Sequence, residues 1–170
     1  MSGWLEAADW KRAQETVPIV CVDVVPIRLD GASAIEKVGL IFRQTPHQGL
    51  RWCVVGGRLW RNESLAEAIR RQLRETLGDA IDYRLDVDPQ PDYVAQYFPA
   101  AREGGTVDPR QHSLTPSFCV AIGGQPEPRG EAMDFRWFDR DRLPSAEEFG
   151  FGQDRVVAAC LAARDRAYRP

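Results

Sequence analysis

This sequence of 170 residues lacks the features that would place a protein in a membrane or on nucleic acid. No apolar run is long enough to cross a bilayer, and the first residues lack the basic region and apolar core of a signal peptide. Basic residues form no block that could follow a phosphate backbone, and a net charge of -3 gives no bulk attraction to nucleic acid. We therefore expect a cytoplasmic protein that binds neither membranes nor nucleic acid.

Cysteine and histidine are also scarce, with four and two residues, and the chain has no internal repeat and no low-complexity segment. The cysteines are widely spaced among apolar neighbours, which favours buried, reduced thiols over disulfides or a zinc site. A composition of 44% hydrophobic and 28% charged residues is typical of globular proteins. A chain of this length can bury one core, so residues 1–170 are predicted to form a single domain.

Hydrophobic patterning predicts strands with helices inserted between and after them. A short amphipathic helix is expected from Trp4 to Gln14, and Pro18 ends it before the first strand. Strands are predicted at residues 19–27, 37–43, 51–55, 93–98, 117–122 and 135–138, with helices at 64–77 and 153–166. This order favours a mixed α/β sandwich over a regular parallel alternation.

The strongest pattern is the helix expected at residues 64–77. Ser64 with Glu67 three residues later resembles a capping box, and Gly78 is well placed to end the helix. An apolar stripe at i, i+4 spacing would pack on a sheet, and it consists of Leu65, Ile69, Leu73 and Leu77. Positions i, i+3 and i+4 share a helix face, so three polar side chains would project together: Gln72, Glu75 and Thr76.

This helix lies in a segment, residues 56–78, that resembles the Nudix box of enzymes that cleave nucleoside diphosphates linked to another group. The positions in register are Gly57, Glu63, Arg71, Leu73, Glu75 and Gly78. The resemblance implies an α/β (α+β) fold of the Nudix type, an α/β/α sandwich with a mixed β-sheet, in which residues 56–78 form a loop-helix-loop. It also implies structural roles for Gly57 and Gly78, and an ion pair between Glu63 and Arg71 that braces the loop.

The same resemblance implies a hydrolase with a site for Mg²⁺ or Mn²⁺ on this helix. The family has Glu at the positions of Gln72, Glu75 and Thr76, and here only Glu75 keeps a charge. Similar enzymes use the backbone carbonyl of the first glycine of the pair, here Gly56, and a residue from a later loop, for which Glu131 is the candidate. Gln72 would orient water rather than deprotonate it.

Within the family, the chain is most similar to GDP-mannose mannosyl hydrolases. The similarity rests on Val17 to Asp23, on Trp52 to Arg58 and on Asp134 to Trp137. It implies that Asp23 contacts the guanine or sugar, and that Arg58 and Arg43 neutralise the diphosphate, for which guanidinium groups are well suited. It also implies a homodimer. The helix within residues 1–16 would lie at the dimer interface or pack within its own chain, and both roles are open.

This chain departs from that branch at its late-loop histidine base, because Ala132 stands at the corresponding position. His112 is another candidate catalytic residue, since it lies in a long polar loop at residues 99–116, and such loops often serve as lids. A solvated loop residue is the alternative for His112. Asp23 could equally be a core polar group with all its hydrogen bonds made.

Three functions are therefore open, each with a small-molecule nucleotide as the ligand. The first is a metal-dependent hydrolase of a nucleoside diphosphate linked to another group, most readily a nucleotide sugar such as GDP-mannose. The second is a catalytically inactive nucleotide-binding or sensor module, which the replacement of two box carboxylates by Gln72 and Thr76 suggests. The third is a pyrophosphohydrolase of free nucleoside di- or triphosphates.

Overall fold

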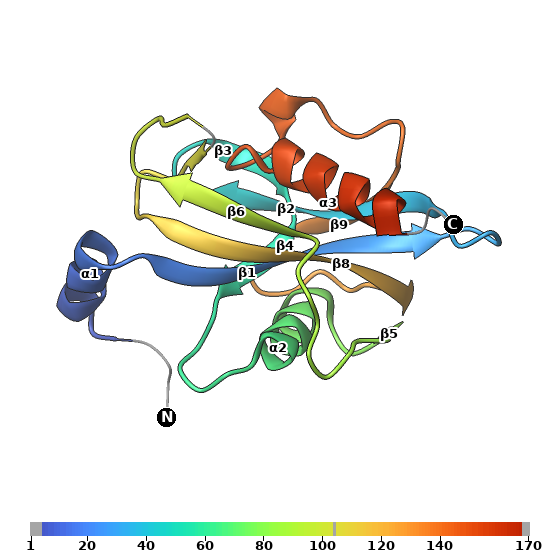
Figure 1. The fold of residues 1–170 in the computed structure, drawn as a ribbon, viewed down its shortest axis with the longest axis horizontal. Coiled ribbons are helices and arrows are strands. Elements are labelled where there is room, and N and C mark those ends of the chain that lie inside the picture. The colour runs from blue at the N-terminus through green and yellow to red at the C-terminus, as the bar shows by residue number, and fades with distance from the viewer. Residues whose placement is uncertain (1–4, 104, 168–170) are drawn as a thin grey trace.

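The computed structural model describes residues 5–103 and 105–167. It contains the mixed α/β sandwich that the sequence predicts, with a nine-stranded sheet between helices α2 and α3 (Figure 1). The elements are α1 (Ala7–Thr16), β1 (Ile19–Leu29), β2 (Ile35–Thr45), β3 (Gly49–Cys53), β4 (Val55–Arg58), α2 (Leu65–Leu77), β5 (Ile81–Tyr83), β6 (Tyr93–Phe98), β7 (Thr106–Val107), β8 (Ser113–Gly124), β9 (Asp134–Asp139), the short 3₁₀ helix η1 (Ala146–Glu148) and α3 (Gln153–Ala167). Trp4, the first residue expected in the N-terminal helix, lies outside the described residues.

Strand β1 is the centre of the sheet, whose main path runs β3-β2-β1-β8-β6-β7. It pairs in parallel with β8 along one edge. Its other edge is shared, because Cys21–Val24 pair with β4 and Ile27–Leu29 pair with β2, both antiparallel. This sharing places the glycine pair of β4 directly beside the first half of β1.

The prediction of one strand at residues 51–55 is wrong, because the chain changes partner there. β3 pairs with β2 and ends at Cys53, whereas β4 begins at Val55 and pairs with β1. Val54 lies between them, and its N–H donates to the side chain of Gln153 (3.0 Å) instead of to a strand. The glycine pair is therefore part of a strand rather than of a loop that follows one.

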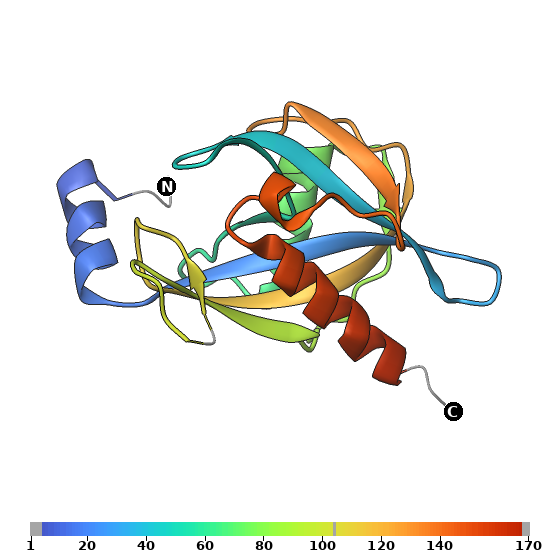
Figure 2. The same ribbon diagram turned by 90° about the horizontal axis from the view of Figure 1, so that it is seen from above.

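Successive side chains of β1 point to opposite faces of the sheet and contribute to two cores, one under α2 and one under α3. Figure 2 shows the two helices on opposite sides of the sheet. Val22 and Val24 pack with α2, while Val25 and Ile27 pack with α3. The stripe expected on α2 is confirmed, since Ile69, Leu73 and Leu77 are fully buried and Leu65 packs against the same cluster. Val156, Val157, Cys160 and Leu161 fill the α3 side as predicted.

The ends of α2 are fixed by local contacts that the sequence predicts. The Ser64 side chain accepts from the backbone N–H of Glu67 (3.2 Å), and the Glu67 carboxylate accepts from that of Ser64 (2.7 Å). Gly78 ends the helix with φ of 82°, a conformation that favours glycine. The expected ion pair is present, with Arg71 Nε 2.6 Å from Glu63 Oε1.

Other boundaries differ from the prediction where pairing rather than local sequence decides them. β8 starts at Ser113, so the preceding loop covers residues 99–112 rather than 99–116 and includes the short strand β7. β5 and β7 were not predicted, and each is defined by its partner, β8 or β6. All four cysteines are free, as expected. None of the helices within the described ranges is long and apolar enough to span a membrane.

Candidate functional site

Helix α3 covers only part of its face of the sheet, and the uncovered part forms a cavity of about 620 Å³. The row of β1 side chains that places Val25 and Ile27 under α3 continues with Asp23 and Cys21, which line the cavity. Ser113 and Thr115 of β8 continue the same floor, as do Tyr97 of β6 and Cys53 of β3. The walls come from α1, from the loop before β8 and from the start of α3.

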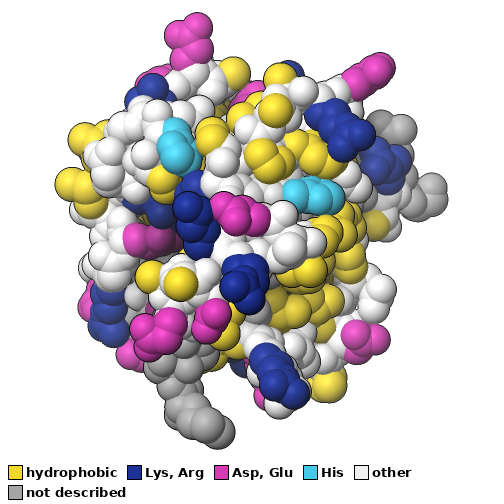
Figure 3. All heavy atoms as spheres, turned by 90° about the vertical axis from the view of Figure 1, so that its left-hand side faces the viewer, with side chains coloured by type: hydrophobic (Ala, Val, Ile, Leu, Met, Phe, Trp, Pro, Cys, Tyr) yellow, Lys and Arg dark blue, Asp and Glu magenta, His cyan; other side chains and the backbone are white. Residues whose placement is uncertain are grey.

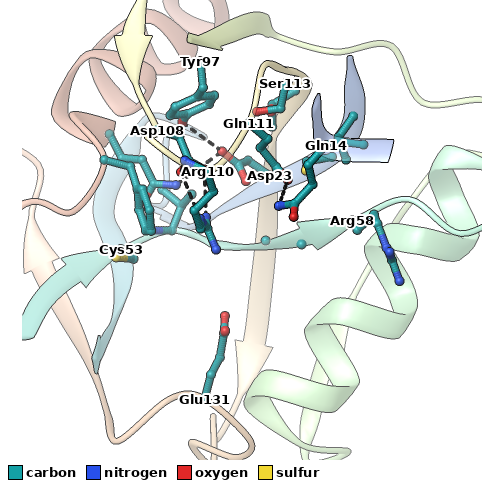
Figure 4. A pocket seen from close by; sticks show the side chains of 18 of the residues that line it. Gln14, Asp23, Cys53, Arg58, Tyr97, Asp108, Arg110, Gln111, Ser113 and Glu131 are labelled. Carbon is teal, nitrogen blue, oxygen red and sulfur yellow. Dashed lines mark hydrogen bonds and ion pairs between the residues drawn. The ribbon is translucent and has the colours of Figure 1, made fainter. Parts of the chain in front are cut away.

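Five residues predicted from sequence meet in this cavity although they are far apart in the chain. They are Asp23 of β1, Arg43 of β2, Gly56 and Arg58 of β4, and Glu131 before β9. In Figure 4 Asp23 lies near the centre, Arg58 at the right, and Glu131 reaches up from below. The cavity thus combines cationic and acidic side chains beside a glycine pair.

Asp23 is a buried carboxyl without an ion pair to a described residue, and only 6% of it is exposed. Its Oδ2 accepts hydrogen bonds from the Tyr97 hydroxyl and from Gln153 Nε2, both at 3.4 Å. Burial raises the pKa of Asp23 to about 7, and the two donors oppose this rise. A Cβ at Gly56 would clash with Asp23 Oδ1, so the glycine leaves the room that this carboxyl occupies.

Arg43 and Glu131 form an ion pair at the cavity, with Nη1 and Oε1 2.6 Å apart. Burial raises the pKa of Glu131, and the Arg43 guanidinium opposes that effect. The loop that carries Glu131 also contacts the last turn of helix α2, because the Arg129 N–H donates to the Thr76 carbonyl (2.8 Å). The end of the box helix and the cavity are therefore joined through this loop.

Glu75 and Gln72 do not line the cavity. Glu75 is 53% exposed and its carboxylate pairs with Arg71 (3.2 Å). Gln72 is buried, and its Nε2 donates to the Gly57 carbonyl (3.0 Å), whereas its Oε1 has no hydrogen-bond partner among the described residues. Within residues 5–103 and 105–167, no three His, Cys, Asp or Glu side chains group into a metal site.

His112 also lies away from the cavity lining. Its ring stacks on Phe98, with centroids 4.8 Å apart, and its backbone carbonyl accepts from the Ile19 N–H (2.9 Å). Its Nε2 is buried without a hydrogen-bond partner in the described part of the chain. The structure therefore places His112 at the join between the loop and β1, while its proposed catalytic role remains a prediction.

Several cavity residues were not predicted from the sequence. Arg110 forms a two-point ion pair with the buried Asp108 (2.8 and 2.9 Å), and Gln153 reaches Asp23 from the start of α3. Trp10 and Gln14 of α1 line the end of the cavity. One signal was available, since small polar residues alternate at Ser113, Thr115 and Ser117 in a strand that is otherwise apolar.

The surface around the α1 end of the molecule carries both signs of charge (Figure 3). Lys and Arg side chains lie among Asp and Glu side chains on this face, without a continuous basic stripe. The visible face therefore lacks the basic track with which proteins follow a phosphate backbone.

Comparison with known proteins places these features in a family and a fold. A family model described as "Domain of unknown function (DUF4916)" matches residues 1–166. None of the curated proteins compared with the chain matches it. Among solved structures, a possible asymmetric diadenosine tetraphosphate (Ap4A) hydrolase from Jonesia denitrificans is 27% identical with a TM-score of 0.80, over 91% of this chain and 99% of that chain.

More distant structures share the fold. A MutT Nudix hydrolase from Burkholderia pseudomallei is 21% identical with a TM-score of 0.63, over 86% of this chain and 98% of that chain. An ADP-ribose pyrophosphatase from Streptococcus suis is 18% identical with a TM-score of 0.55, over 87% and 92%. The prediction of a Nudix-type sandwich is therefore confirmed.

Proposed function

Because this chain belongs to the family described as a domain of unknown function (DUF4916) and has the Nudix fold, we propose that it hydrolyses a nucleoside diphosphate linked to a further group. Structural neighbours that are Nudix hydrolases support an enzyme of this class. A nucleotide sugar is the substrate that we propose within the class. Water would attack the diphosphate or the sugar carbon, and the bond from that atom to the bridging oxygen would break.

The observation that carries this proposal is the cavity beside the glycine pair. Arg43 and Arg58 line it from two different strands, so the cavity offers two guanidinium groups to a diphosphate. Asp23 lies deeper, where it would contact the nucleoside or sugar. A cavity of about 620 Å³ is within the usual size of small-ligand sites.

The described residues offer a partial donor set for a divalent ion. Among them, Gln72 Oε1 is a buried oxygen without a partner, and Glu75 lies nearly one turn further along the same helix. Magnesium is commonly bound by one or two carboxylates together with water and substrate phosphates, so this set fits an ion that arrives with its substrate. Glu75, the Gly56 carbonyl and Glu131 are the proposed ligands, Gln72 would orient the attacking water, and the ion would neutralise charge on the diphosphate.

The names of the neighbours guide the choice of substrates to test. One is described as a possible Ap4A hydrolase and another as an ADP-ribose pyrophosphatase. A third, a bifunctional NMN adenylyltransferase/ADP ribose pyrophosphatase from Francisella tularensis, is complexed with AMP and a Mn ion. Dinucleoside polyphosphates and ADP-ribose therefore belong beside GDP-mannose in the substrate panel. Free nucleoside di- and triphosphates test the pyrophosphohydrolase alternative.

The rival function is a nucleotide-binding module without turnover. Its support is that Glu75 is engaged by Arg71 and that Gln72 Nε2 is occupied by the Gly57 carbonyl. Restoring carboxylates with Gln72→Glu and Thr76→Glu separates the two functions. Both positions are buried, so the new carboxylates would ionise only beside a cation, and turnover gained with Mg²⁺ would indicate a dormant site.

The deciding experiment is product analysis of the panel in H₂¹⁸O with Mg²⁺, Mn²⁺ or EDTA. We expect metal-dependent turnover, with the label on phosphate after attack at phosphorus and on the sugar after attack at carbon. Glu75→Gln should abolish the metal-dependent turnover. Arg74→Gln, which changes an exposed residue on the same helical turn, should leave that turnover unchanged. No turnover of any compound, with thermal stabilisation by a nucleotide in EDTA, would establish the binding module instead.

A further inference from the structure

Helix α1 lies at one end of the molecule, away from α2 and α3 (Figures 1 and 2), and it lines the cavity without contributing to the core. None of its residues is buried, and Leu5 and Val17 at its two ends are more than half exposed. Side chains of the helix contact the body of the protein at the cavity. Gln14 bonds to Gln111, and Trp10 stacks against the guanidinium of Arg58. Both contacts lie at the cavity, so the helix is positioned relative to the site rather than to the core.

Trp10 gives this end of the cavity an aromatic wall. The Arg58 guanidinium carbon lies 4.3 Å from the centroid of its ring, and the indole remains partly exposed where it lines the cavity. A tryptophan held by a cation over one face is a platform on which a planar ring can stack. Stacking on an aromatic side chain stabilises binding of any nucleobase, because every base has a π-face.

Beside this wall, an amide pair offers hydrogen bonds to the edge of a base. Gln14 Nε2 donates to Gln111 Oε1 (2.9 Å), and Figure 4 shows the two side chains next to each other. Whichever amide donates, the pair retains one oxygen and one amino group for a ligand. Nucleobases present a donor next to an acceptor on their edges, which amide side chains match. Gln111 is only 8% exposed, so this pair has a fixed place in the wall.

We propose that the α1 end of the cavity is a nucleobase subsite, in which a purine stacks on Trp10 and is hydrogen-bonded by Gln14 and Gln111. The diphosphate of the same ligand then reaches Arg58 and Arg43, so the base and the phosphates occupy adjacent parts of one cavity. This inference rests on the proposed function, because it assumes a nucleotide ligand. It adds the orientation of that ligand and gives purines an advantage over pyrimidines through their larger stacking surface.

The test is calorimetric binding of ADP, UDP and inorganic pyrophosphate to the full chain in EDTA, where no turnover of the panel is expected. We expect ADP to bind more tightly than UDP, and UDP more tightly than pyrophosphate. Trp10→Ala should weaken ADP about five- to 150-fold and pyrophosphate far less, since ADP loses its stacking platform whereas pyrophosphate still meets Arg58, which loses only its stacking partner. Trp10→Phe should recover part of the ADP affinity. Gln14→Ala should weaken ADP without affecting pyrophosphate.

Arg12→Ala is the matched control, because Arg12 is exposed on the same helix and does not line the cavity. It should leave all three affinities unchanged. If Trp10→Ala leaves ADP affinity unchanged, or weakens pyrophosphate as much as ADP, the subsite is wrong while diphosphate binding and the proposed function stand. If the wild-type protein binds none of the three compounds either in EDTA or with Mg²⁺, the proposed function fails and the subsite fails with it.

Discussion

Replacing Asp23 by Asn is expected to stabilise the protein at neutral and alkaline pH and to change little at pH 4. Burial raises the pKa of Asp23 from its ordinary value of 3.8 to about 7 in the folded state. Between these values the folded protein keeps a proton that the unfolded chain has lost, so the free energy of unfolding falls as pH rises. Each pKa unit is worth about 1.4 kcal/mol, so the loss reaches roughly 4 kcal/mol by about pH 7.

The amide introduced by Asp23→Asn would carry no charge at any of these pH values, so the variant should lack this loss. Its carbonyl oxygen can still accept from Tyr97 and Gln153, which keeps the local hydrogen bonds. The difference between variant and wild type should therefore grow from near zero at pH 4 to several kcal/mol at pH 8. Glu63 and Glu67, whose pKa values are lowered, act in the opposite direction in both proteins and cancel in the difference.

Urea denaturation followed by circular dichroism at pH values from 4 to 8.5, in EDTA, measures this difference. A companion variant, Tyr97→Phe, removes one hydrogen-bond donor that lowers the pKa of Asp23. In this variant the fall in the free energy of unfolding should therefore continue to a higher pH than in wild type. A difference between Asp23→Asn and wild type that stays constant over this range would refute the reasoning. It would mean that Asp23 is already ionised in the folded protein at pH 5.

Three further tests address the Glu63–Arg71 ion pair, Gly56 and the proposed divalent ion. Arg71→Met should cost about 3 kcal/mol in urea denaturation, because it leaves the half-buried Glu63 without its cation, and adding Glu63→Gln should restore part of this. Gly56→Ala should cost about 1–3 kcal/mol through its clash with Asp23, whereas Gly31→Ala, with open space around it, should change stability by less than about 0.5 kcal/mol. Mg²⁺ without a nucleotide should leave the melting temperature unchanged, whereas Mg²⁺ added to the ADP complex should raise it further. Loss of that extra shift in Glu75→Gln would support the metal assignment. Persistence of the shift in Glu75→Gln would contradict it.

The parts of the fold that sequence predicts well are those fixed by neighbouring residues. The cap at Ser64, the stop at Gly78 and the apolar stripe between them all lie within one helix, and all are confirmed. The division of residues 49–58 into two strands could not be read locally, because it depends on which edge of β1 and β2 is free. The two-residue strand β7 has the same origin.

In the site, too, the sequence predicts what neighbouring residues determine but not the contacts between elements that are distant in the chain. Helical spacing predicted that Gln72 and Glu75 project together, but only the packed structure shows that Gln72 bonds to Gly57 and that Glu75 pairs with Arg71. Asp23 was found through the family resemblance. Its donors Tyr97 and Gln153 come from two other elements, and no spacing in the sequence relates them to it.

The guanidinium groups of the cavity have consequences for selectivity among anions. Arg43 and Arg110 are each held by a carboxylate, Glu131 and Asp108, so a ligand must displace or share these partners. A single orthophosphate or sulfate gains one such contact at a time and competes poorly with a carboxylate that is already in place. A diphosphate would engage several cations together and benefit from their effective concentration. If the cavity binds a diphosphate as proposed, the paired arginines would favour it over simple anions such as orthophosphate and sulfate.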